Sequence, residues 1–176
     1  MAKKGIVIFA VVAVVVIVGA LFFWQSRNSG LKIGEEDQGD LERLVTLTFI
    51  DYAGRSVSLA EFSGNPLVVN SWAVWCPFCV EELKDFAALQ AEFEGQITVI
   101  TIDRAEPLET AKPFTDNLGV TDKMNFWLDS RDTFYKAIGG FGMPETLFIN
   151  SAGEIVVHKR GPMDLEEMRR HVGSII

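Results

Sequence analysis

The chain has 176 residues, 48% of them hydrophobic, and a formal net charge of −8. This length and composition suit one domain with a proper apolar core and leave residues for a further segment. The first thirty residues hold three basic residues and no acidic ones, so the remainder has thirteen basic against twenty-four acidic residues and a charge of −11. An acidic domain without a basic stripe is a poor partner for nucleic acid, and we expect no nucleic-acid binding.

The chain begins with a long apolar run at residues 5–24, about the length of a helix that crosses a bilayer. Two lysines precede the run, and no acidic residue appears before Glu35. By the positive-inside rule the short N-terminus stays in the cytoplasm and the rest of the chain is exported. A cleaved signal peptide is the alternative. The apolar run continues past its small-residue site at residues 18–20, so we favour an uncleaved anchor.

These patterns divide the chain into three parts. Residues 1–25 are the predicted transmembrane anchor, and residues 26–42, which are polar, glycine-containing and aperiodic, are a predicted linker. Residues 43–176 are the predicted domain. We expect this domain to be extracytoplasmic and held at the cell membrane by a single pass, with the N-terminus in the cytoplasm.

Beyond the linker, hydrophobic periodicity predicts alternating strands and helices. Apolar, β-branched runs predict strands at 44–50, 55–59, 66–73, 97–103, 126–128, 145–150 and 154–158. Helical spacing and capping residues predict helices from 77 to a stop at Gly95, from 107 to about 118, over 130–138 with Asp129 or Ser130 as its cap, and from 164 onward. This order predicts an α/β fold with a mixed central sheet flanked by helices.

The strongest chemical signal is Cys76-Pro77-Phe78-Cys79, which holds both cysteines of the chain and follows the strand at 66–73. We expect Cys76 at the N-cap of a helix and Pro77 at its first position. The helix dipole and the free amides of the first turn then favour the Cys76 thiolate, which is the species that attacks disulfides. Cys79 lies one turn further on the same face, close enough to pair with Cys76. We therefore expect an outward-facing reactive sulfur at position 76 with its partner beneath it.

Two other uses of the cysteine pair have less support. A zinc site needs about four protein ligands, and the two histidines, His158 and His171, are far from the cysteines in sequence. A permanent structural disulfide over so short a loop removes little chain entropy. The pair thus indicates reversible redox chemistry, and we expect no metal and no cofactor.

The segment around the cysteines, together with Met143-Pro144-Glu145-Thr-Leu-Phe-Ile-Asn150, resembles the thioredoxin fold. More narrowly, it resembles the membrane-tethered branch of that fold, namely the TlpA, ResA and CcmG (DsbE) proteins. The resemblance covers about residues 44–176. It implies that the bond between Met143 and Pro144 is cis, that this loop lies against the cysteine pair, and that its backbone receives an extended client peptide.

The resemblance also suggests roles for three polar residues. Glu82 matches an acidic residue that tunes the thiols in this branch, through like charge or by carrying a proton; the alternative is a solvated glutamate on the helix surface. Glu145 follows Pro144 and is placed similarly. Asn70 stands where ordinary thioredoxins keep a buried aspartate, so we expect that particular proton relay to be absent.

Two aromatic residues next to the cysteines are further candidates. Trp75 precedes Cys76 and is predicted to cover the pair and exclude water, in preference to Trp72, although both are also explained as core aromatics. Phe78 occupies the variable dipeptide between the cysteines. That dipeptide influences the redox potential, so Phe78 leaves the direction of electron flow open.

The expected function is that of an extracytoplasmic thiol–disulfide oxidoreductase that reduces disulfides in exported client proteins, as in cytochrome c maturation. Because the chain has no third cysteine, a membrane electron donor must regenerate its dithiol. A disulfide-donating oxidase is the alternative within redox chemistry. A Cu(I) carrier or tethered binding module is the alternative from another class, since soft thiolates suit Cu(I).

Overall fold

The computed structural model describes residues 43–176, and the predicted anchor and linker lie outside the described residues. Within residues 43–176, no helix is both long enough and apolar enough to cross a membrane. The strands are β1 (Phe49–Asp51), β2 (Ser56–Val57), β3 (Leu67–Trp72), β4 (Thr98–Arg104), β5 (Asn125–Asp129), β6 (Glu145–Ile149) and β7 (Ile155–Arg160). The helices are the short 3₁₀ helix η1 (Leu59–Phe62), α3 (Pro77–Glu92), α4 (Leu108–Leu118), α5 (Thr133–Ala137) and α6 (Leu165–Val172).

The strands form one mixed sheet in the order β2-β1-β5-β4-β3-β6-β7. The central strands β3, β4 and β5 run parallel, while β1, β2, β6 and β7 join them by antiparallel pairing. All six residues of β3 are buried, as expected for a central strand covered on both faces. The predicted α/β fold with a mixed sheet is therefore confirmed.

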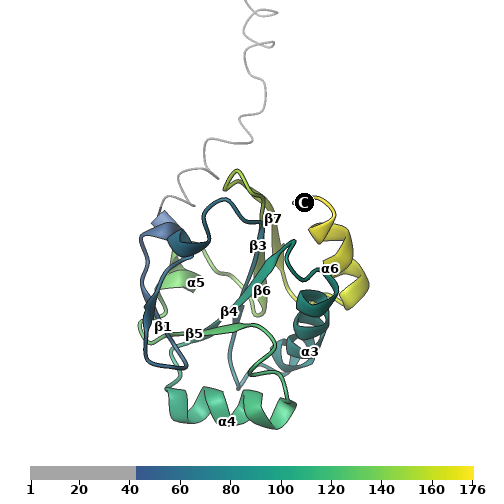
Figure 1. The fold of residues 1–176 in the computed structure, drawn as a ribbon. Coiled ribbons are helices and arrows are strands. Elements are labelled where there is room, and N and C mark those ends of the chain that lie inside the picture. The colour runs from purple at the N-terminus through teal and green to yellow at the C-terminus, as the bar shows by residue number, and fades with distance from the viewer. Residues whose placement is uncertain (1–42) are drawn as a thin grey trace, which may run out of the picture. The chain divides into compact units, whose positions relative to one another are not determined.

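Helices cover both faces of this sheet, and Figure 1 shows α3 and α6 together on one side and α5 on the other. Successive strand residues point to opposite faces, so neighbouring positions enter different cores. Val69 and Ile100 pack with Phe134 of α5, whereas Val68 and Val99 pack with Phe86 of α3. A third cluster, at the carboxyl ends of the parallel strands, contains Trp72, Cys76, Cys79, Leu83, Ala111, Val120 and Phe126.

Three predicted elements differ from the structure, and the first is the strand at 44–50. Its first residues form a helical turn, and β1 begins only at Phe49. Leu44 is fully buried in the core and Leu47 packs against the same cluster, a spacing of three that suits a turn of helix better than a strand. The Leu47 amide donates to the Leu44 carbonyl at 3.1 Å, which closes that turn.

The other two differences are also local. The strand at 55–59 shrinks to Ser56–Val57 because Ser58 forms a capping box with Glu61 and starts η1. The helix at 130–138 shrinks to Thr133–Ala137. Its N-cap is Asp132 rather than the predicted Asp129 or Ser130, although the Asp129 carboxylate still accepts from the Phe134 amide at 2.7 Å.

Candidate active site

The cysteine pair lies where the sequence predicts it, at the junction of β3 and α3. Cys76 is the N-cap of α3, Pro77 occupies the first turn, and the Cys76 sulfur accepts from the Cys79 amide at 3.3 Å. The two sulfurs form a disulfide of 2.04 Å. The Cys76 amide donates to the Ala73 carbonyl at 3.1 Å, so a tight turn carries the chain from the strand to the sulfur. This location favours negative charge on Cys76 when the disulfide is reduced.

The expectation that Cys76 faces outward is wrong for the disulfide form. Only 3% of Cys76 and 1% of Cys79 are exposed, and both belong to the apolar cluster that contains Trp72. The exposure of the neighbouring aromatic residues differs from the prediction. Trp75 is 60% exposed and Phe78 is 58% exposed, whereas Trp72 is fully buried. Trp72 is therefore the aromatic that packs with the pair, while Trp75 and Phe78 present apolar surface beside it.

The bond between Met143 and Pro144 is cis, as the resemblance implied. Met143 packs against the cluster that holds both cysteines, so this loop lies against the pair. The Pro144 carbonyl accepts from the Gly161 amide at 2.9 Å, which ties the loop to the segment between β7 and α6.

Glu82 is buried, so it is not the solvated surface residue that was the alternative. It is 3% exposed and lies on α3 one turn beyond Cys79. One carboxylate oxygen accepts from the Met163 amide at 2.8 Å, while the other has no hydrogen-bond partner among the described residues. Burial raises the pKa of Glu82 to about 8, because the charged form loses its hydration. Glu82 therefore retains a proton at neutral pH and can exchange it near Cys79.

Glu145 and Asn70 are both buried and both stabilise the architecture around the site. One Glu145 oxygen accepts from the Phe141 and Gly142 amides, and the other lies 2.7 Å from Nε2 of His158. Glu145 thus fixes the loop that leads to the cis bond. Asn70 donates to the Thr146 hydroxyl at 3.0 Å and joins β3 to β6, so no carboxyl occupies that position.

Sequence reasoning missed two acidic residues, Asp103 and Glu106. Asp103 is the last residue but one of β4 and is fully buried, and its carboxylate accepts from the Glu106 amide at 3.0 Å. The Glu106 carboxylate in turn accepts from the Val74 amide at 2.7 Å, two residues before Cys76. The available signal was an aspartate that ends an otherwise apolar, β-branched strand.

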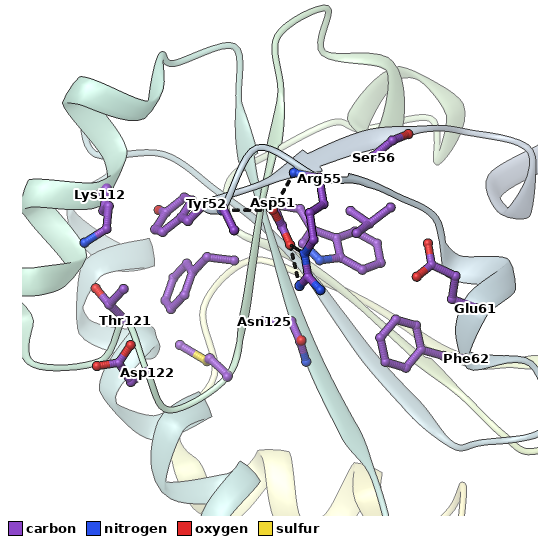
Figure 2. A pocket seen from close by; sticks show the side chains of 15 residues that line it. Asp51, Tyr52, Arg55, Ser56, Glu61, Phe62, Lys112, Thr121, Asp122 and Asn125 are labelled. Atoms are coloured by element: carbon purple, nitrogen blue, oxygen red, sulfur yellow. Dashed lines mark hydrogen bonds and ion pairs between the residues drawn. The ribbon is translucent and has the colours of Figure 1, made fainter.

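A pocket of about 700 Å³ lies elsewhere, between the β1–β2 turn and the segment that joins α4 to β5. Figure 2 shows its lining, in which Arg55 pairs with Asp51, and Tyr52, Thr121 and Asp122 also take part. None of the residues that the sequence predicted for the site lines this pocket. The disulfide, the cis-proline loop and the buried carboxyls, rather than this pocket, make up the candidate active site.

A thioredoxin-like sheet with a Cys-x-x-Cys disulfide at a helix N-terminus and a cis-proline loop beside it defines the class of thiol–disulfide oxidoreductases. The Redoxin family matches residues 39–175. The chain belongs to this family and, within it, to the TlpA/ResA/CcmG group of thioredoxin-like proteins.

Individual relatives agree with this assignment. The thiol–disulfide oxidoreductase ResA of Halalkalibacterium halodurans is 31% identical over 122 residues, which is 68% of either chain. Two solved structures share the fold. A secreted disulfide oxidoreductase of Mycobacterium tuberculosis has a TM-score of 0.68 at 20% identity, covering 76% of this chain and 98% of that one. A DsbE-type interchange protein from Chlorobium tepidum has a TM-score of 0.67 at 19% identity, covering 73% and 92%.

Proposed function

We propose that this oxidoreductase reduces disulfides in exported client proteins, from a position on the outer face of the cell membrane. The observation that carries the reductive direction is the burial of both sulfurs beside buried carboxyls. A strong oxidant of this fold stabilises its reduced, thiolate form. In this protein the burial of the sulfurs and the neighbouring carboxyl groups disfavour the thiolate. The reduced form is therefore less stable, and the dithiol is a better electron donor.

The proposed reaction transfers two electrons in two exchange steps. The Cys76 thiolate attacks one sulfur of the client disulfide, a mixed disulfide forms, and the other client sulfur leaves as a thiolate. Cys79 then loses its proton, for which the ionised form of Glu82 is the proposed acceptor, and attacks the Cys76 sulfur. The second client sulfur leaves as a thiolate, and both client thiolates take up protons. The chain is left oxidised with its own disulfide.

The disulfide must then be reduced again for a further cycle. A membrane electron donor that supplies two electrons and two protons is the proposed source, since this chain has no third cysteine. The apolar run at residues 5–24 supports a single-pass anchor that holds the domain close to such a donor. The cysteine pair of an apocytochrome c haem site is the proposed client, on the resemblance to the cytochrome c maturation proteins.

Donation of the disulfide to exported proteins is the second candidate function. The observation that favours it is the bond from the Cys79 amide to the Cys76 sulfur at the N-terminus of α3, because this geometry stabilises a thiolate. The two functions differ in reduction potential, which can be measured directly.

The reduction potential of the full-length protein is the first test. Equilibration in thiol–disulfide buffers, with the oxidised fraction counted by alkylation and mass spectrometry, should give a potential below about −200 mV if the protein is a reductant. A value near about −120 mV, as for a strong oxidant of this fold, would instead support disulfide donation. The Asp122→Asn variant, altered on an exposed loop, should match the parent protein and serves as the control.

The different roles of the two cysteines, one attacking and one resolving, give a second test. The Cys79→Ala variant should accumulate mixed disulfides with clients through Cys76, because the resolving thiol is missing. The Cys76→Ala variant should accumulate none, because Cys76, at the N-cap of α3, is the proposed attacking thiol. Non-reducing gels followed by identification of the trapped chain would measure both. Equal trapping by the two variants would contradict the proposed roles.

A further inference from the structure

The structure contains a second acidic element at the redox site, formed by Asp103 and Glu106, which contacts the segment that precedes Cys76. Asp103 pairs in register with Trp72 on the neighbouring strand, so both side chains lie on the sheet face that α3 covers. Trp72 packs in the same cluster as both cysteines. Asp103 is therefore enclosed next to the redox core, where an isolated carboxylate is costly.

The turn after β4 brings Glu106 back onto Asp103. Ala105, between them, has φ of 60°, a left-handed conformation that non-glycine residues rarely adopt. The turn closes with the bond from the Glu106 amide to one Asp103 oxygen, and the other Asp103 oxygen has no partner among the described residues. Strain of this kind persists only where the surrounding contacts hold it, and here it keeps the Glu106 backbone against the buried Asp103 carboxyl.

Asp103 is enclosed in the apolar core with the Glu106 carboxyl nearby, so a charge on Asp103 is disfavoured. In agreement with this geometry, burial and the adjacent Glu106 carboxyl raise the pKa of Asp103 to about 8. The neighbouring cation does not neutralise the pair: Arg104 is bound by Asp132 at 2.8 and 2.7 Å.

The other ionisable groups near the pair are few. Tyr52, after β1, faces it, and the pKa of Tyr52 is raised by burial and by the charges of Asp103, Asp116 and Glu106. Asp116, on α4, is itself held by Lys112 at 2.8 Å. Among the ionisable residues of α3, Cys79 and Glu82 are the buried ones.

The pair is connected to the reactive sulfur through the backbone. Glu106 binds the Val74 amide, and the Cys76 amide closes the same turn onto Ala73. We propose that Asp103 holds a proton beside the Glu106 carboxyl, and that these two residues, through this turn and the charge of Asp103, act as positioning residues that control the ionisation of Cys76. When Asp103 loses its proton, an additional negative charge opposes the Cys76 thiolate, so the two titrations are coupled.

The test measures how the reactivity of Cys76 depends on pH, in the fully reduced full-length protein. Because Glu82 also titrates near pH 8, the comparison is made between Glu82→Gln and the double variant Glu82→Gln/Asp103→Asn. Asparagine keeps an oxygen for the Glu106 amide but cannot ionise. The turn is therefore preserved, while position 103 no longer titrates. Alkylation by iodoacetamide at Cys76 is followed by mass spectrometry from pH 5 to 10.

In Glu82→Gln, the rate of Cys76 alkylation plotted against pH should show a second inflection near pH 8. Above this pH the rate should deviate on the order of threefold from the curve for a single ionisation. The double variant should follow a single-ionisation curve, and Glu82→Gln/Asp122→Asn should retain the second inflection. A purely structural role for Asp103 would change the rate by a constant factor at every pH. Identical curve shapes with and without Asp103 would overturn the proposal.

A second variant keeps the test decisive if the Asp103→Asn protein does not fold. Glu106→Gln retains an oxygen for the Val74 amide but removes the like charge from Asp103, so the inflection should move below pH 8. An inflection that stays near pH 8 in this variant would also overturn the proposal. Alkylation requires neither a client nor an electron donor, so the outcome is independent of the direction of electron flow.

Discussion

Replacing Cys76 with serine should abolish disulfide exchange. A hydroxyl does not attack a disulfide, and loss of the nucleophile typically lowers the rate of such enzymes by roughly 10⁴- to 10⁶-fold. The loss is expected in an insulin-reduction assay driven by dithiothreitol, after subtraction of the uncatalysed rate. The fold should persist, since the sulfur-to-oxygen change is small and the N-cap position of α3 accepts serine well.

The matched control for this variant is Ser130→Ala, which alters an exposed residue in the segment between β5 and α5. It should retain the parent rate. Substantial exchange by Cys76→Ser, with loss of exchange only in Cys79→Ser, would show that the roles of the two cysteines are reversed.

Replacing Glu82 with glutamine should change how the free energy of unfolding depends on pH. The pKa of this carboxyl is raised from 4.5 to about 8 in the folded protein, so between these values the folded state binds more protons than the unfolded state. Stability of the parent protein must therefore fall as pH rises from about 4.5 to 8. Glutamine imitates the protonated acid and keeps an oxygen for the Met163 amide, so it removes this loss.

The variant should unfold with about the same free energy as the parent near pH 4.5. It should be more stable by about 3–5 kcal/mol above pH 8, which is the size of a shift of about three pKa units in a buried group. Urea denaturation of the oxidised proteins at pH 4.5, 6.5 and 8.5 measures the difference. A difference between the two proteins that does not change with pH would show that Glu82 ionises normally and is not desolvated.

The parts of the fold that were predicted well are those with strong local signals. The strand β3, the start of α3 and the cap of α6 at Asp164 follow from a β-branched run, a proline at a first helical turn and a capping residue. The strand predicted at 44–50 was wrong in its first half because the β-rich composition of these residues favours a strand, whereas the packing of Leu44 and Leu47 against the core favours a turn of helix.

The sequence by itself determined the position of the disulfide and the identity of the N-cap, because Cys76, Pro77 and Cys79 interact within a single helical turn. Tertiary structure decided which acids belong to the site. Glu82 is buried where its carboxylate accepts from the amide of Met163, 81 residues away, and Glu106 reaches Val74 across 32 residues. It also decided that Trp72 is buried and Trp75 exposed. Burial depends on segments distant in the chain, and burial is what moves the pKa of a carboxyl or a thiol.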